Sequence, residues 1–159
     1  MPSYLLDTNH CSRLLQGDRD MVQRLTELDA ATVATSVIVR GELVFMVEKS
    51  ERKIANFRRL ETMLARLTMY SIDTDTADWY GTLKAALLDR FGPKEKSKRR
   101  KIKIEAIGVT ENDLWIAATA KRHGAIIVSA DRDFERIAAI TDLVREYWWS
   151  PATNGSAEP

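Results

Sequence analysis

The segment between Gly108 and Phe134 constrains the fold more than any other part of the sequence. It reads as a loop, a helix, a glycine that ends the helix, and a strand over 125–128 that is apolar throughout. Asp131 and Asp133 stand just beyond this strand, and Asp113 lies in the first turn of the preceding helix. In open α/β sheets the ligand crevice lies outside the carboxyl ends of the strands. These acids therefore mark a candidate functional site.

Short apolar strands alternate with helices along the rest of the chain. Further strands are predicted at 4–6, 32–35, 69–72 and 143–147. Helices are predicted from Asp7, over 19–28, from Ser36 to Glu48, around 57–67, over 73–91 and from about Phe134. This alternation, without an internal repeat, predicts a three-layer α/β fold in which a central parallel sheet is flanked by helices on both faces.

The composition narrows the chemistry that such a site can perform. A single cysteine, Cys11, excludes a disulfide framework and a cysteine-based zinc site, and two histidines argue against a histidine-rich metal site. A bound metal is therefore expected to be a hard cation with oxygen ligands. We expect one domain over 1–149 and a disordered tail over 150–159. A cytoplasmic protein that does not enter the membrane is expected, because no signal peptide or membrane span is evident.

Acidic residues occupy comparable places in several predicted elements, at the end of a strand or in the first half of the helix that follows. These residues are Asp7, Glu42, Asp113, and Asp131 or Asp133. In a parallel sheet such places converge on one edge. Glu42 is expected in an apolar helical stripe with Phe45 and Met46, and Asp113 in a stripe with Ile116. Buried, mutually repelling carboxylates require compensation, and a divalent cation is the simplest form of it.

The ligand set indicates a class of reaction. Carboxylate sites suit Mg²⁺ or Mn²⁺, which activate water and stabilise the leaving oxygen in phosphodiester hydrolysis. No Ser-His-Asp or Cys-His arrangement, glycine-rich phosphate loop or zinc spacing competes with this interpretation. Taken singly, each acid also has a simpler explanation. Asp7 is a good helix cap, Glu42 could lie on the surface, and Asp113 is favoured by the dipole of its helix. Asp131 and Asp133 could cap the helix that follows them.

Basic residues are concentrated in one segment, 94–103, which is predicted to be a loop. It holds seven basic residues and one acid, whereas the remaining sequence holds 17 basic and 22 acidic residues. Such asymmetry favours a polyanionic partner. The candidate residues for binding such a partner are Lys96, Lys98, Arg99, Arg100, Lys101 and Lys103. The alternative is a flexible, solvated loop without a partner.

Four segments together resemble the motifs of the PIN-domain nucleases, and more narrowly the VapC-type toxins of toxin–antitoxin pairs. They are Leu5–Asn9, Thr35–Ser36 with Glu42 six residues on, Gly108–Ala118 and Ile127–Phe134. The similarity covers nearly the whole chain in the expected order. It implies a Mg²⁺- or Mn²⁺-dependent endoribonuclease that acts on structured RNA such as tRNA or ribosomal RNA. It also implies homodimerisation and a small antitoxin protein that blocks the site.

The resemblance also assigns roles to individual residues. Carried over position by position, the catalytic, metal-binding acids are Asp7, Glu42, Asp113 and Asp131. Supporting groups are Asn9, Thr35, Ser36 and Asp133. The chain departs from the pattern mainly in the long basic insertion before Gly108, which leaves the substrate preference open.

Two alternative functions share this fold. A housekeeping PIN nuclease of RNA maturation would act without an antitoxin. A non-catalytic RNA-binding or regulatory module would bind RNA without cutting it, although the complete set of acids argues against this function. An aspartate-dependent phosphatase is disfavoured because its nucleophile motif requires a second aspartate where this chain has Asn9.

Overall fold

The computed structural model describes residues 2–28 and 32–148, which form a five-stranded sheet with the strand order β3-β2-β1-β4-β5. The strands are β1 (Ser3–Leu6), β2 (Thr32–Ser36), β3 (Thr68–Tyr70), β4 (Ile126–Val128) and β5 (Arg145–Glu146). All neighbouring strands pair in parallel. The predicted parallel sheet is confirmed, with small shifts at its two edges: β3 begins one residue earlier than predicted, and β5 keeps only the centre of the predicted strand.

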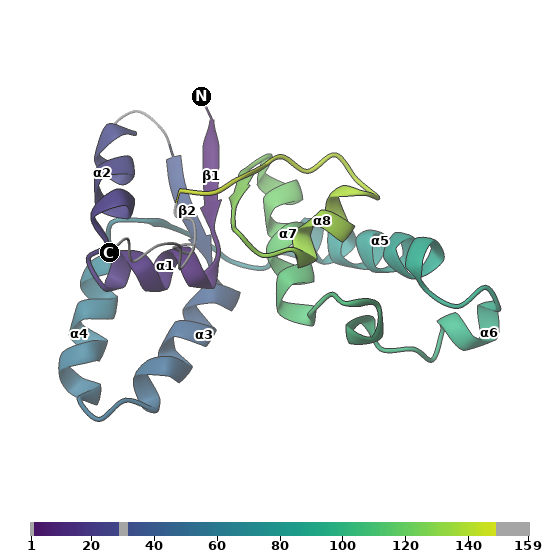
Figure 1. The fold of residues 1–159 in the computed structure, drawn as a ribbon, viewed down its shortest axis with the longest axis horizontal. Coiled ribbons are helices and arrows are strands. Elements are labelled where there is room, and N and C mark those ends of the chain that lie inside the picture. The colour runs from purple at the N-terminus through teal and green to yellow at the C-terminus, as the bar shows by residue number, and fades with distance from the viewer. Residues whose placement is uncertain (1, 29–31, 149–159) are drawn as a thin grey trace, which may run out of the picture.

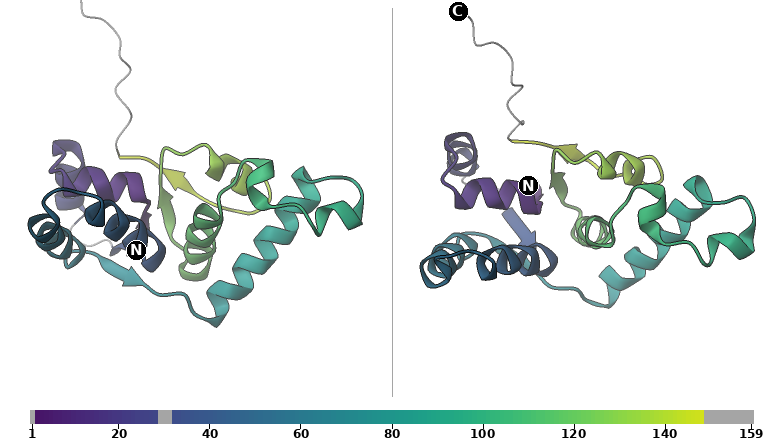
Figure 2. Two further views of the ribbon diagram at one scale, coloured as in Figure 1. Left: turned by 90° about the horizontal axis from the view of Figure 1, so that it is seen from below. Right: turned by 60° about the horizontal axis from the view of Figure 1, so that its bottom comes forward.

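Helices cover both faces of this sheet. They are α1 (Thr8–Leu15), α2 (Arg19–Glu27), α3 (Val37–Glu48), α4 (Lys53–Leu64), α5 (Thr74–Phe91), α6 (Lys96–Arg99), α7 (Glu111–His123) and α8 (Asp133–Ala138), with the 3-10 helix η1 at Ile104–Ile107. Figures 1 and 2 show α1 to α4 on one side of the sheet and α5, α7 and α8 on the other. This arrangement confirms the predicted three-layer α/β fold.

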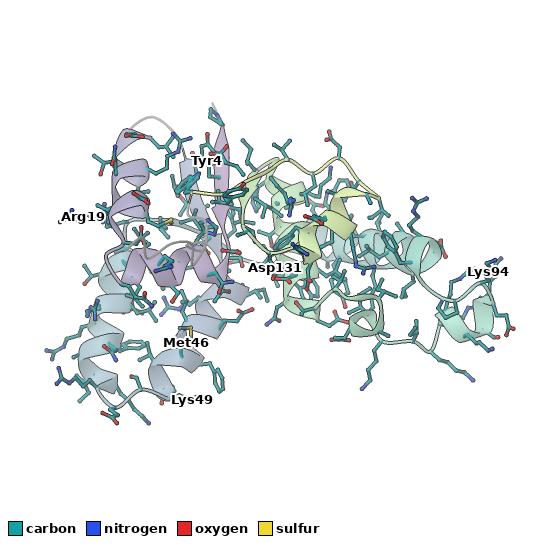
Figure 3. The ribbon with its side chains drawn as sticks, in the orientation of Figure 1. Tyr4, Arg19, Met46, Lys49, Lys94 and Asp131 are labelled. Carbon is teal, nitrogen blue, oxygen red and sulfur yellow. The ribbon has the colours of Figure 1, made fainter. Side chains whose placement is uncertain are left out.

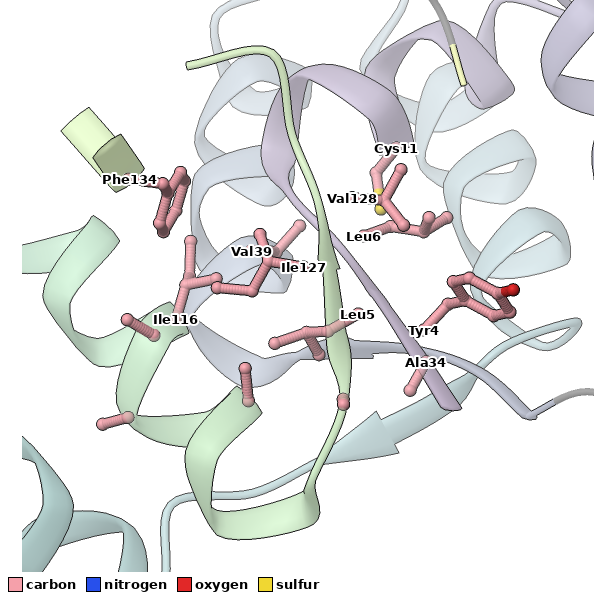
Figure 4. Packing of buried hydrophobic residues seen from close by; sticks show 14 of the residues in the cluster. Tyr4, Leu5, Leu6, Cys11, Ala34, Val39, Ile116, Ile127, Val128 and Phe134 are labelled. Carbon is pink, nitrogen blue, oxygen red and sulfur yellow. The ribbon is translucent and has the colours of Figure 1, made fainter. Parts of the chain in front are cut away.

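The core is built around the two central strands. Leu5 and Leu6 of β1 and Ile127 and Val128 of β4 have no exposed side-chain surface. Figure 4 shows Leu5 and Ile127 on the side of Ile116 of α7, whereas Leu6 and Val128 lie beside Cys11 of α1. Strands that are covered on both faces bury side chains on both, which explains why 4–6 and 126–128 read as continuous apolar runs.

Short polar side chains set the starts of the main helices, as the sequence indicates. Asp7, Ser36, Asp73 and Thr110 cap α1, α3, α5 and α7, each accepting a hydrogen bond from the backbone N–H three residues on. Helix α7 ends at Gly124, whose φ of 60° is left-handed and favours glycine. Because the first turns of α1 and α7 follow these caps directly, the caps fix where the acids lie.

The prediction that 94–103 is a loop is wrong in part, because four of its residues form α6. Lysine and arginine are good helix formers, and two ion pairs hold the turn: Lys98 with Glu95 and Arg99 with Asp89, both at 3.6 Å. The predicted tail at 150–159 lies outside the described residues. Within the part of the chain that the structure describes, no helix is long and apolar enough to cross a membrane.

Candidate metal centre

Three aspartates converge beyond the carboxyl end of β4. Asp113 lies in the first turn of α7, Asp131 lies in the turn after β4, and Asp133 is the first residue of α8. Each offers a carboxylate oxygen, and these three oxygens lie within 4.8 Å of one another. Figure 3 places Asp131 near the middle of the molecule, between the two groups of helices.

Burial and mutual repulsion both act on the carboxylates of this cluster. Burial, followed by the nearby Asp131 carboxylate, raises the pKa of Asp113 from 3.8 to about 7. The same two causes raise the pKa of Asp133. Like charges at this separation cannot all ionise without cost, so a cation between them would stabilise the ionised cluster.

Backbone hydrogen bonds hold the cluster in shape. The Asp133 N–H donates to Oδ1 of Asp131 at 2.9 Å, and the Asp131 N–H donates to Oγ of Ser129 at 3.0 Å. Arg145 of β5 donates to the Asp131 carbonyl at 3.1 Å. At the start of α7, the Asp113 N–H donates a hydrogen bond to Oγ1 of Thr110 at 3.1 Å, which fixes the backbone of Asp113. The acids are therefore positioned by the turn after β4 and by the start of α7.

Asp7 lies outside this set of three but is connected to it. Its Oδ1 accepts hydrogen bonds from the backbone N–H of His10 at 2.8 Å and pairs with His10 Nδ1 at 2.9 Å. Its Oδ2 accepts a hydrogen bond from the Ser129 hydroxyl, which in turn accepts one from the Asp131 N–H. Asp7 is thus a helix cap, as one interpretation of the sequence holds. Its role as a metal ligand stays a prediction.

Glu42 is also outside the set of three, and the structure corrects the argument for its burial. Phe45 and Met46, which were expected to bury it, are 62% and 47% exposed. The side of α3 that faces the core instead carries Val39, Leu43 and Val47. Polar contacts hold the Glu42 carboxylate: Thr8 Oγ1 and Asn112 Nδ2 each donate to it at 2.7 Å. Asn112 precedes Asp113, so Glu42 is tied to the same end of α7.

The other supporting residues have structural contacts. Thr35 is fully buried and donates to the Leu6 carbonyl at 3.0 Å, which fixes the end of β1 just before Asp7. Ser36 caps α3 through Val39 N–H at 3.3 Å. Asn9 is exposed in the first turn of α1. Asp133, predicted to be supporting, lies within the acidic cluster itself.

Helix α6, which carries the predicted RNA-binding residues Lys96, Lys98 and Arg99, lies away from the acids. Figure 3 shows Lys94 at the far end of the molecule, beside α6, and Asp131 near its middle. Arg99 is held by the Asp89 carboxylate at 3.6 Å and by the Lys94 carbonyl at 3.3 Å. Lys96, Arg100, Lys101 and Lys103 are exposed.

Three residues that join the acids were not singled out from the sequence: Ser129, Thr8 and Asn112. Each stands directly beside a predicted acid or in the same turn, and each carries a short side chain that can donate a hydrogen bond. Their positions, after β1 and β4 for Thr8 and Ser129 and in the first turn of α7 for Asn112, were the available signal. Donors in such places orient carboxylates, so these residues are parts of the site.

The donor set fits a hard divalent cation. All the side chains that converge are carboxylates, which suit Mg²⁺ and Mn²⁺, and such an ion would offset both the burial and the repulsion that raise the pKa of Asp113. The arrangement lies at the edge of a parallel sheet where ligands bind in this class of fold.

Comparisons with known proteins agree with this geometry. The PIN domain model matches residues 4–140. Ribonuclease VapC2 of Haemophilus influenzae is 32% identical over 142 residues, which cover 88% of this chain and 96% of that protein. The tRNA(fMet)-specific endonuclease VapC of Shigella flexneri is 26% identical over 141 residues, with coverages of 88% and 96%.

Solved structures give the same result. A chain of VapBC2 from Rickettsia felis, bound to a promoter DNA fragment, superimposes with a TM-score of 0.75 at 28% identity and covers 92% of this chain and 98% of its own. A chain of DNA-bound VapBC from Salmonella typhimurium superimposes with a TM-score of 0.74 at 25% identity. It covers 94% of this chain and 100% of its own. This chain therefore belongs to the PIN domain family and, within it, to the VapC ribonucleases.

Proposed function

We propose that this protein is a divalent-metal-dependent endoribonuclease and the toxin of a toxin–antitoxin pair. The observation that carries the proposal is the convergence of Asp113, Asp131 and Asp133 within 4.8 Å, at the ligand-binding edge of a sheet of the VapC family. Residues 1–149 would form the catalytic domain, and the protein would act in the cytoplasm.

In this proposal the three clustered aspartates, together with Asp7 and Glu42, hold one or two Mg²⁺ or Mn²⁺ ions. When bound, such an ion activates water for attack on phosphorus and stabilises the charge of the leaving oxygen. Ser129 keeps the Asp7 carboxylate and the Asp131 backbone in a fixed relation. Thr8 and Asn112 hold Glu42 from two elements, which pre-orients its carboxylate.

The proposed substrate is a structured RNA. One relative is named as a tRNA(fMet)-specific endonuclease, which makes tRNA the first substrate to test and ribosomal RNA the second. The proposed partners are a small antitoxin, because the solved neighbours are VapBC complexes, and a second copy of this chain.

The test is cleavage of total tRNA and ribosomal RNA by the purified protein with Mg²⁺ or Mn²⁺. We expect discrete fragments that disappear with EDTA and fall at least about 100-fold for Asp113→Asn and Asp131→Asn, the size typical of lost groups that stabilise a transition state. Asp20→Asn, an exposed acid of α2, is the matched control and should cut normally.

Two results would contradict the proposal. RNA that binds but stays intact with every divalent ion would favour the non-catalytic binding module. Cleavage without growth arrest on expression, and without a neighbouring antitoxin gene, would favour the housekeeping nuclease.

A further inference from the structure

A pocket of about 520 Å³ adjoins the acidic cluster on the side of α8. Its lining residues are Phe91, Gly108, Arg132, Asp133, Glu135, Arg136 and Ala139. Asp133 thus belongs both to the acidic cluster and to the wall of this pocket. A volume of this size is in the range of small-ligand sites and can accommodate a nucleotide unit.

The pocket wall contains two cationic side chains, Arg132 and Arg136, beside two acidic ones, Asp133 and Glu135. Among the described residues, no carboxylate oxygen lies within 4.0 Å of a side-chain nitrogen of Arg132 or Arg136, although an acid directly precedes each of them in the sequence. The neighbouring Glu135 lies 3.7 Å from Arg145 instead. Arg132 and Arg136 are both exposed and line the same pocket. Guanidinium groups in this state favour a phosphate ligand.

The pocket wall is shaped around Arg136. Gly108 has a φ of 80°, and a Cβ placed there would lie 3.2 Å from Arg136 Nε, so any other residue would require the guanidinium to shift by a few tenths of an ångström. The guanidinium carbon of Arg136 lies 5.5 Å from the centre of the Phe91 ring, within the distance of a cation–π contact. The ring contact therefore places the exposed guanidinium of Arg136 beside Phe91 at the pocket wall.

The pocket also stands between the acids and the basic segment. Phe91 is the last residue of α5, directly before that segment, and Gly108 follows η1 at its other end. The segment itself projects toward the far end of the molecule, away from Asp131 (Figure 3). An RNA strand running from the acids to the basic segment would therefore cross the pocket.

We propose that this pocket binds the RNA backbone next to the bond that is cut, with Arg132 and Arg136 contacting a phosphate and Phe91 positioning Arg136. The inference rests on the proposed nuclease function. It assigns binding beside the cut to these two arginines, whereas the basic segment binds RNA further along the strand.

The test is the affinity for fluorescently labelled, unfractionated tRNA in EDTA, measured by anisotropy over a range of salt concentrations. We expect Arg136→Gln to raise the Kd about tenfold and to reduce the slope of log Kd against log salt by about 0.7–0.9, the value of one lost phosphate contact. Arg136→Lys retains the charge and should retain the slope. Arg58→Gln, an exposed arginine of α4, is the matched control and should change neither quantity.

Phe91→Leu tests the positioning role without removing a charge. We expect a weaker affinity with a wild-type salt slope, and thermal melting checks that the variant remains folded. If the wild type cleaves RNA but Arg136→Gln has the Kd and salt slope of the wild type, the pocket inference is overturned and the nuclease proposal stands. If RNA binding depends on Arg136 but no RNA is cleaved, the nuclease proposal is overturned and the pocket remains only as a site for the RNA backbone. Binding of no RNA by the wild type would overturn both.

Discussion

At the scale of single residues, the site depends on small side chains as much as on acids. Ser129 has 1% of its surface exposed and joins the Asp7 carboxylate to the backbone that carries Asp131. Gly108 contributes by having no side chain, because it leaves room for Arg136 and takes a left-handed backbone. Neither role is visible from residue type alone, since serine and glycine after a strand or before a helix are common in turns.

Replacing Gly108 by alanine should therefore affect both stability and RNA binding. A left-handed backbone costs a residue with a Cβ about 1–2 kcal/mol, so we expect urea unfolding to show a loss of this size, and the added Cβ should weaken tRNA affinity by displacing Arg136. Gly124→Ala has a similar φ but open space around its Cβ, so it should lose stability with unchanged affinity. Gly81 lies in the interior of α5 with open space where a Cβ would be, so Gly81→Ala should raise the free energy of unfolding by about 0.5–1 kcal/mol. Equal affinity for the Gly108 and Gly124 variants would contradict the role of Gly108.

At the scale of helices and strands, the sequence predicts most elements because caps and apolar runs are local signals. Asp73 and Gly124 limit α5 and α7 where expected. The predictions that failed depend on tertiary contacts. The segment 94–103 becomes helical where Asp89 and Glu95 pair with its arginine and lysine side chains. Phe45 was expected in the core by its spacing, but an apolar stripe does not reveal which neighbour covers it.

Helices α3 and α4 leave an apolar surface, where we expect the proposed antitoxin to bind. Phe45, Met46, Ile54 and Phe57 are 62%, 47%, 74% and 39% exposed, and a neighbouring pocket of about 220 Å³ is lined by residues of α1, α3 and α4. Exposed apolar groups on neighbouring elements mark interaction surfaces. We expect Phe45→Ser with Ile54→Ser to weaken antitoxin binding at least tenfold in a pull-down or calorimetric titration, since each loses about 1–3 kcal/mol of burial.

The same double variant should cut RNA at the wild-type rate, because neither residue belongs to the cluster of Asp113, Asp131 and Asp133. Val144→Ser, which removes a comparably exposed apolar side chain near β5, is the control and should leave antitoxin binding unchanged. Wild-type antitoxin affinity in the double variant would exclude this surface. A loss of self-association instead would assign it to the homodimer.

At the scale of the whole molecule, the topology assembles the site. Asp7 comes to lie beside the turn that carries Asp131 because β1 and β4 are adjacent and parallel, so both carboxyl ends face the same edge. That convergence could be predicted from the order of the elements. The sequence could not predict that three aspartates form the cluster while Asp7 and Glu42 lie outside it and are connected to it by hydrogen bonds. This arrangement depends on the turn after β4 and on the hydrogen-bond donors Ser129 and Asn112.

The cluster should also make the stability of the metal-free protein depend on pH. The folded-state pKa of Asp113 is about 7, against 3.8 for a free side chain, so the folded protein retains a proton that the unfolded chain has released. Its contribution to stability is complete below about pH 4 and is lost as the pH rises to about 7, and the raised pKa of Asp133 acts in the same direction. The lowered pKa of His123 acts in the opposite direction, so the comparison must be with Asp113→Asn.

In EDTA, we expect the Tm of the wild type to fall relative to the Tm of Asp113→Asn as the pH rises from about 4 to 7. Above that range the difference between the two Tm values should stay constant. At pH 7.5, Mn²⁺ should raise the Tm of the wild type, because an ion that binds only the folded state stabilises it by mass action, and should raise that of Asp113→Asn much less. Asp20→Asn should behave as the wild type does in both experiments. Parallel curves for the wild type and Asp113→Asn would mean that the carboxylates do not repel one another as this geometry requires. An equal response of both proteins to Mn²⁺ would place the ion elsewhere.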